Sequence, residues 1–178
     1  MDELLGDPAV LPHLEDVARL LLACSCGAIV GWDREARGRP AGLRTHILVA
    51  LGACGFMVLA GHLAANVAEA GVAEVTVDPG RVVAAVVGGI GFLGAGAIIH
   101  AGGSVRGLTT AAGLWVTAAI GGSLGAGAYV LGGSLTVLAF LVIALLRLLE
   151  GKAAEADPAE LPGSEKGGEK SEKGGEQE

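Results

Sequence analysis

LLLACSCGAIVG (Leu20–Gly31) is an uncharged apolar segment, and it runs directly into WDREARGRPAGLRTH (Trp32–His46), which holds four of the chain's eight arginines. Further apolar stretches, separated by short polar or Gly-rich links, continue to Leu146. Short loops rich in arginine remain on the cytoplasmic side when a membrane protein is inserted. The alternation therefore indicates a multi-pass protein of the bacterial inner membrane.

Five apolar stretches are candidates for membrane-spanning helices, since about 17–25 apolar residues cross a bilayer. They are Val17–Trp32, Ile47–Ala68, Val82–Ile99, Leu108–Gly127 and Tyr129–Leu146. The first stretch is the weakest, because Arg19 lies within it and has to extend outward to the interface. The sequence predicts an all-α fold, a bundle of five transmembrane helices.

Three regions follow from this pattern. Residues 1–16 form an extracytoplasmic N-terminus, residues 17–149 the five-helix membrane domain, and residues 150–178 a low-complexity cytoplasmic tail. The tail repeats SEKGGE at 164–169 and 171–176 and has no aromatic residue, so we expect it to be disordered. An N-terminus outside and a C-terminus inside leave only Arg19 and Arg81 on the outer side, which the distribution of arginine favours.

Glycine is unusually frequent, with 31 residues in 178. Small residues let membrane helices approach each other closely. We expect such packing at Gly27 and Gly31, at Gly88, Gly89, Gly91, Gly94 and Gly96, and along the stripe Gly113, Thr117, Gly121 and Gly125. The pattern favours close crossings around the third and fourth helices.

Several kinds of chemistry are disfavoured. The sequence GIGFLG (Gly89–Gly94) matches a dinucleotide fingerprint but lies in a membrane-length apolar stretch, and no acidic residue follows about 20 residues later. Cys24, Cys26 and Cys54 lack the spacing of a zinc site and fit small buried residues. No acidic residue falls in the middle of a predicted helix, which argues against an autonomous ion pump. We expect no enzymatic activity, no cofactor and no nucleic-acid partner.

The first link holds the densest group of polar residues. It contains Asp33, Arg34, Glu35, Arg37, Arg39, Pro40, Gly42, Arg44, Thr45 and His46. Its arginines can anchor the orientation of the protein, bind lipid phosphates, bind carboxylates of a partner, or pair with the local acids. The residues alone leave these alternatives open.

Two helix starts also carry polar residues. Asp78, followed by Pro79, is typical of an N-cap, and its carboxylate is also a weak candidate for a divalent cation. Thr109 and Thr110 can cap the fourth helix or bond carbonyls one turn back.

Four ordered blocks resemble the MgtC/SapB family of bacterial membrane proteins. They are RPAGLRTH (39–46), DPGR (78–81), GIGFLGAG (89–96) and VRGLTTAAGLWVTAAIG (105–121). The resemblance implies a five-helix inner-membrane domain with functional residues at matching positions: Asp33, Arg34, Arg44, Thr45, His46, Asp78, Arg81, Thr109, Thr110 and Trp115. Because a Gly/Glu/Lys tail replaces the folded cytoplasmic domain of longer members, the shorter SapB-like form is the nearer match.

The resemblance also implies a function linked to magnesium limitation. We expect a non-enzymatic protein that supports magnesium homeostasis through a membrane partner such as the ATP synthase. The alternative is a small transporter or channel for magnesium or another cation, probably a homo-oligomer, in which Gly-rich helices line a path of carbonyl groups.

Overall fold

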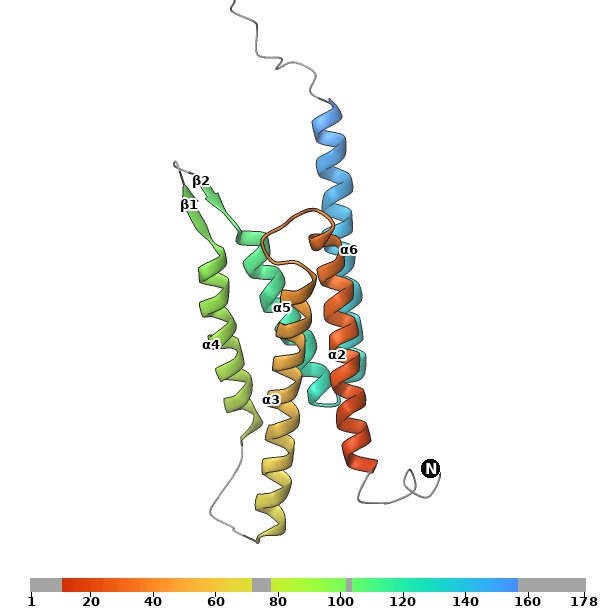
Figure 1. Ribbon diagram of the computed structural model, residues 1–178, viewed down its shortest axis with the longest axis vertical. Coiled ribbons are helices and arrows are strands. Elements are labelled where there is room, and N and C mark those ends of the chain that lie inside the picture. Colours follow the sequence, from red (N-terminus) through yellow and green to blue (C-terminus); the bar gives the residue numbers. More distant parts are fainter. Residues whose placement is uncertain (1–10, 72–77, 102–103, 157–178) are drawn as a thin grey trace, which may run out of the picture. The chain divides into compact units, whose positions relative to one another are not determined.

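The computed structural model describes residues 11–71, 78–101 and 104–156, which form five helices and one short hairpin (Figure 1). Their bounds are α2 Leu11–Glu35, α3 Leu43–Glu69, α4 Pro79–Ala97, β1 Ile99–Ala101, β2 Ser104–Arg106, α5 Leu108–Gly125 and α6 Tyr129–Ala156. The predicted all-α class is confirmed. The tail was expected to be disordered from residue 150, but residues 150–156 continue helix α6, because their Ala, Lys and Glu residues favour a helix. The rest of that tail, 157–178, and most of the N-terminal region lie outside the described residues.

The chain divides into two compact units, residues 1–143 and 144–178. In the second unit, residues 144–156 are the end of α6. The first unit holds all of the other described elements and the sites discussed below.

Helix bounds lie close to the predicted apolar stretches. For example, the stretch Ile47–Ala68 is the inner part of α3. The larger differences are at α6, which continues from the predicted end at Leu146 to Ala156, and at α2, which begins at Leu11 and extends to Glu35, beyond both ends of Val17–Trp32. Polar residues can continue a helix past the apolar segment, because backbone hydrogen bonds do not depend on hydropathy.

The turn between α2 and α3 is closed by its own residues. Gly38 has φ +60°, a left-handed conformation that favours glycine. The Glu35 carboxylate accepts a hydrogen bond of 3.0 Å from the backbone N–H of Leu43, the first residue of α3. This bond joins the end of one helix to an otherwise unpartnered donor at the start of the next.

The third link, residues 100–107 between the predicted stretches Val82–Ile99 and Leu108–Gly127, contains part of an antiparallel hairpin in which His100 pairs with Val105. Gly107 follows with φ +91° and is the N-cap of α5, without a side-chain capping bond. A Cβ at Gly107 would overlap the Ala97 carbonyl, so only glycine fits here. The alternative in which Thr109 or Thr110 caps this helix is therefore wrong.

Three helices meet in the main core. Helix α3 packs against α2, α4 and α5. The core cluster consists of small and medium side chains from α2, α3 and α5: Ala23, Cys26, Val30, Ala50, Cys54, Ile120 and Leu124. Residues Leu135, Ala139 and Ile143 of α6 pack against this cluster. Small core side chains mean that the helix backbones themselves come close together.

Three of the helices are long and apolar enough to cross a membrane: α3, α4 and α5. The described apolar part of α6, Tyr129–Leu145, is a somewhat shorter segment of the same kind. A full crossing by α2 stays a prediction, because its polar residues keep it outside that group.

Successive helices run in alternating directions in the first unit (Figure 1). The α2–α3 turn and the β1–β2 hairpin lie at one end, whereas the start of α4 and the α5–α6 turn lie at the other. This arrangement places the first and third links together, as a five-span protein requires.

Candidate functional site

A buried arginine joins three parts of the chain at the end where the first and third links meet. Arg34, in the last turn of α2, is only 4% exposed. Its Nε donates a hydrogen bond of 3.0 Å to the Ala41 carbonyl, and a terminal guanidinium nitrogen donates one of 2.5 Å to the Thr110 hydroxyl. A guanidinium removed from water needs such acceptors, since burial of an unsatisfied charge is costly.

His46, in the first turn of α3, is fully buried beside this arginine. Its Nδ1 lies 2.9 Å from the Gly42 carbonyl, so Nδ1 carries the proton in the neutral ring. Nε2 then has a free lone pair, and it has no hydrogen-bond partner among the described residues. A Cβ at Gly113 of α5 would lie 3.5 Å from Nε2, so this glycine leaves room for the ring.

We call this group the Arg34 cluster: Arg34, Ala41, Gly42, His46 and Thr110. Of the predicted site residues, the structure brings together Arg34, Gly42, His46 and Thr110. Arg34 and Thr110 are 76 positions apart in sequence. The cluster therefore ties the α2–α3 turn to the first turn of α5.

The acids of the first link are engaged locally. An Asp33 carboxylate oxygen forms an ion pair of 2.7 Å with Arg37, one helical turn away. Glu35 accepts the Leu43 N–H. Arg39 and Pro40 are exposed on the turn, and the Arg39 side chain bonds no other described residue. The link thus presents free positive charge at its surface.

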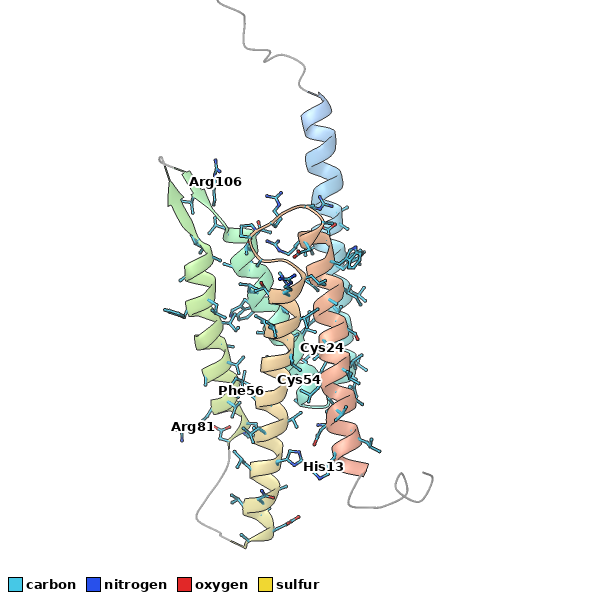
Figure 2. All side chains as sticks on the ribbon, in the orientation of Figure 1. His13, Cys24, Cys54, Phe56, Arg81 and Arg106 are labelled. Atoms are coloured by element: carbon cyan, nitrogen blue, oxygen red, sulfur yellow. The ribbon has the colours of Figure 1, made fainter. Side chains whose placement is uncertain are left out.

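The remaining predicted residues lie elsewhere. Arg44 and Thr45 face a groove between α3 and α4, and Arg81 lies at its far end (Figure 2). Asp78 is the N-cap of α4, as predicted, and accepts the Gly80 N–H at 2.8 Å. Trp115 is 51% exposed and lines a pocket between α4 and α5.

The glycines divide differently from the expectation. A Cβ built on Gly121 or Gly125 of α5 would come within 3 Å of the α3 backbone, and Gly27 and Gly31 of α2 are equally tight against α3. By contrast, a Cβ on Gly88, Gly89, Gly91 or Gly96 of α4 meets no described atom within 4 Å, and Gly94 makes only ordinary contact with Ala111. The close crossings centre on α3. Of the two helices around which they were predicted, the fourth, α5, does cross α3 closely, whereas the third, α4, makes no such crossing through its glycines.

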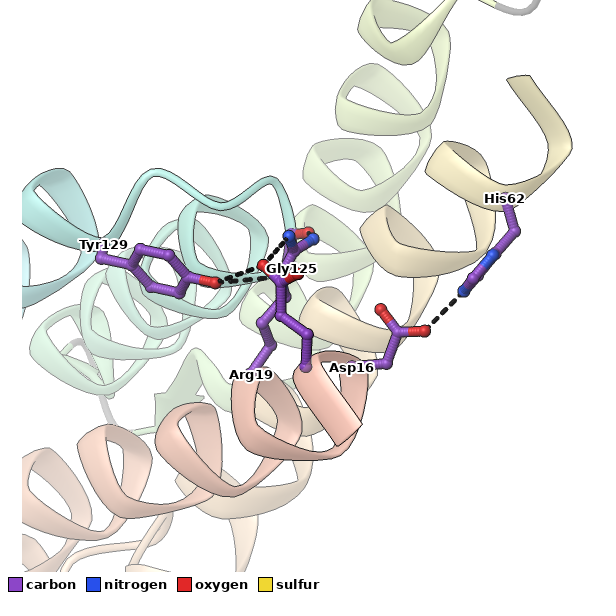
Figure 3. A network of polar contacts seen from close by, with 6 residues as sticks. Asp16, Arg19, His62, Gly125 and Tyr129 are labelled. Atoms are coloured by element: carbon purple, nitrogen blue, oxygen red, sulfur yellow. Dashed lines mark hydrogen bonds and ion pairs between the residues drawn. The ribbon is translucent and has the colours of Figure 1, made fainter. Parts of the chain in front are cut away.

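A second polar network lies at the opposite end (Figure 3). Arg19 donates hydrogen bonds to Glu15 at 2.5 Å, to the Tyr129 hydroxyl at 3.1 Å and to the Gly125 carbonyl at 3.1 Å. Its bond to Glu15, together with that from Tyr129, lowers the pKa of Glu15. The side chain of Arg19 thus extends toward the N-terminal part of α2, where Glu15 lies, and also bonds the α5–α6 turn.

A histidine and an aspartate lie beside this network. The Asp16 carboxylate is 2.6 Å from Nε2 of His62, and the rings of His13 and His62 are 6.5 Å apart. Neither the Arg19 network nor the Asp16–His62 pair was predicted from the sequence. The four-residue spacing of Glu15 and Arg19 was the available signal for one of them.

No metal centre is evident in the described part of the chain, where no three His, Cys, Asp or Glu side chains are grouped to hold an ion. Asp78, the weak candidate, is committed to its capping bond. Magnesium is bound in proteins by several oxygen ligands, with water completing the shell.

The helices and the buried polar cluster define an all-helical membrane protein. The chain belongs to the MgtC family, whose model matches residues 20–152. The resemblance stated from the sequence motifs is thereby confirmed. No solved structure matches the chain.

Curated relatives are similar over most of the chain. It is 45% identical over 136 residues to the Escherichia coli K12 protein named "Putative magnesium transporter YhiD", covering 76% of this chain and 62% of that protein. It is 43% identical to Protein MgtC of Brucella abortus and 40% identical to Protein MgtC of Salmonella typhimurium, covering 78% and 74% of this chain. Those matches cover 54% and 52% of the relatives, so the chain spans roughly half to three fifths of their length.

Proposed function

We propose that this protein supports magnesium homeostasis in the bacterial inner membrane by acting on a partner protein, without catalysing a reaction. The observation that carries the proposal is the distribution of paired and exposed charges in the first link. Its acids are engaged by Arg37 and by the Leu43 N–H, whereas Arg39 is exposed. A basic surface at a membrane boundary suits carboxylates of a neighbouring membrane complex.

The Arg34 cluster supports the same proposal. It holds the α2–α3 turn against α5, so the link is presented in one conformation. A binding surface that is already ordered loses less conformational entropy when a partner docks. On the family resemblance, the ATP synthase is the first partner to test.

The arrangement of the helices argues against a cation path through this single chain. The α3–α5 contact is closed by Gly121 and Gly125, and the buried Arg34 repels cations at one end. Two hydroxyl groups farther along α5 bond their own helix: Thr117 donates to the Gly113 carbonyl, and Ser123 donates to the Ala119 carbonyl.

The second candidate function is cation transport. It is favoured by the name of the Escherichia coli relative and by the open glycine face of α4. In a homo-oligomer, that face could meet another helix closely and expose carbonyl groups to a path.

The test is magnesium flux into proteoliposomes that contain only this purified protein, with an imposed gradient. We expect no saturable flux. Saturable flux that is lost in Gly91→Leu, with normal insertion of the variant, would make the protein a transporter and overturn the proposal.

Growth in low magnesium tests the partner surface. In a host that lacks its own MgtC-family protein, we expect Arg39→Gln to abolish growth support at unchanged membrane levels. Arg37→Gln is the matched control, because Arg37 is already paired with Asp33. Equal growth of Arg39→Gln and the wild type would contradict a role for this surface.

A further inference from the structure

The groove between α3 and α4 is not used by the proposed function. It encloses about 860 Å³ and is lined mainly by apolar side chains of both helices, among them Leu48, Phe56 and Leu93. Gly52 and Gly89 lie in its wall, and a Cβ at either would meet no described atom within 4 Å. The absence of side chains at these two positions creates the hollow.

The groove faces the surroundings of the protein at membrane depth. Both of its helices are long and apolar enough to span a bilayer. Leu48 is 64% exposed and Phe56 is 59% exposed. Because lipid is the solvent at this depth, the concave wall is accessible to acyl chains.

Arginine lies at both ends of the groove, and no acidic residue lines it. Arg44 lies at one end of the groove, in the first turn of α3. Arg81 lies at the other end, near Phe56 (Figure 2). Residues 44 to 56 of a helix span about 18 Å at about 1.5 Å per residue. This length suits the acyl chains of one leaflet, which fill about 15 Å, half of the hydrocarbon core.

The two ends differ in charge. At the Arg44 end, the acids of the first link are engaged, Arg39 is exposed nearby in sequence, and the half-buried Thr45 adds a hydroxyl to the groove wall. At the Arg81 end, Asp78 lies three residues away and is exposed. The Arg44 end is therefore the more favourable place for an anion.

We propose that the α3–α4 groove is a binding site for an anionic phospholipid, with its acyl chains along the groove and its phosphate at Arg44 and Thr45. Basic pockets between membrane helices bind such headgroups, and each basic residue near the surface contributes about 1 kcal/mol to the attraction. The proposal holds whether the protein regulates a partner or transports an ion.

The test compares phosphatidylglycerol with phosphatidylcholine on the full chain in detergent, with native mass spectrometry to measure the fraction of protein that retains one lipid. We expect the wild type to prefer phosphatidylglycerol. Arg44→Gln should lower that preference about fivefold, the effect of losing one such basic residue. Arg81→Gln is the matched control at the opposite end and should keep the preference.

A second pair of variants tests the groove itself. Gly89→Leu should fill it and reduce retention of both lipids, whereas Gly88→Leu, next to it on α4 but outside the groove wall, should not. Equal retention of the two lipids by the wild type, or loss of the preference in Arg81→Gln instead of Arg44→Gln, would overturn the proposal. A dimer lost only in Gly89→Leu would assign the groove to a second copy of the chain and would also overturn it.

Discussion

At the residue scale, the contact between Arg34 and Thr110 is the most consequential. The sequence indicated that both were candidate site residues, Arg34 from the charged link and both from their positions in family motifs. It did not indicate that they touch. Thr110 is 3% exposed, and its hydroxyl accepts a hydrogen bond from a guanidinium that is itself buried. Loss of either group leaves the other without its partner in a dry site.

Thr110→Val tests this contact. Valine keeps the shape of threonine but cannot accept the hydrogen bond, and a hydrogen bond to a charged group contributes about 1.5–3 kcal/mol. We expect a lower midpoint of thermal unfolding in detergent, and partial recovery in Thr110→Ser.

Thr109→Val is the control for that measurement, because Thr109 is exposed on the same helical turn. It should leave the unfolding midpoint within error of the wild type. The same midpoint in Thr110→Val and Thr109→Val would mean that the Arg34 contact adds no stability.

At the element scale, glycines on α2 and α5 determine how closely these helices approach α3. The stripe Gly113, Thr117, Gly121 and Gly125 could be predicted from its four-residue spacing, and it does face α3. The five glycines between positions 88 and 96 of α4 could not be assigned in the same way, since a spacing of small residues exists on almost every face of that helix. Only the rotation of α4 in the bundle decides which of them meet a neighbour.

Gly121→Ala tests the α3–α5 crossing. The added Cβ would lie within 3 Å of the Ala50 backbone, which cannot move without shifting α3. Overpacking of this kind costs about 1–3 kcal/mol. We therefore expect a lower unfolding midpoint in detergent for this variant.

Gly122→Ala provides a neighbouring comparison. Its Cβ would meet only the flexible Met57 side chain, at 3.8 Å. Alanine also favours the helix relative to glycine, so this variant should be as stable as the wild type or slightly more so. If both variants unfolded at the wild-type midpoint, the crossing would be looser than the structure shows.

At the scale of the whole molecule, the alternation of helices places the arginine-rich first link and the third link at one end. The distribution of arginine predicts that this end is cytoplasmic. The insertion machinery and the membrane set the orientation of the protein. The arrangement of helices within the bundle therefore does not by itself determine which end is cytoplasmic.

Labelling with a membrane-impermeant maleimide checks the orientation. Ala70→Cys, at the end of α3, should react in intact spheroplasts, whereas Ala36→Cys, in the first link, should react only after the membrane is opened. The wild type gives the background, because its described cysteines lie within helices. Reaction of Ala36→Cys in intact spheroplasts would reverse the predicted orientation.

The sequence by itself determined the helical class, the approximate bounds of the helices, the capping role of Asp78 and the family. These properties depend on hydropathy, on capping residues and on short ordered motifs, all of which are local along the chain. The tertiary structure alone decided that Arg34 meets Thr110, that His46 lies against Gly113, and that α3 rather than α4 receives the closest crossings. Such contacts depend on the rotation and register of helices that are far apart in sequence, and several arrangements of these apolar helices would satisfy the same hydropathy pattern.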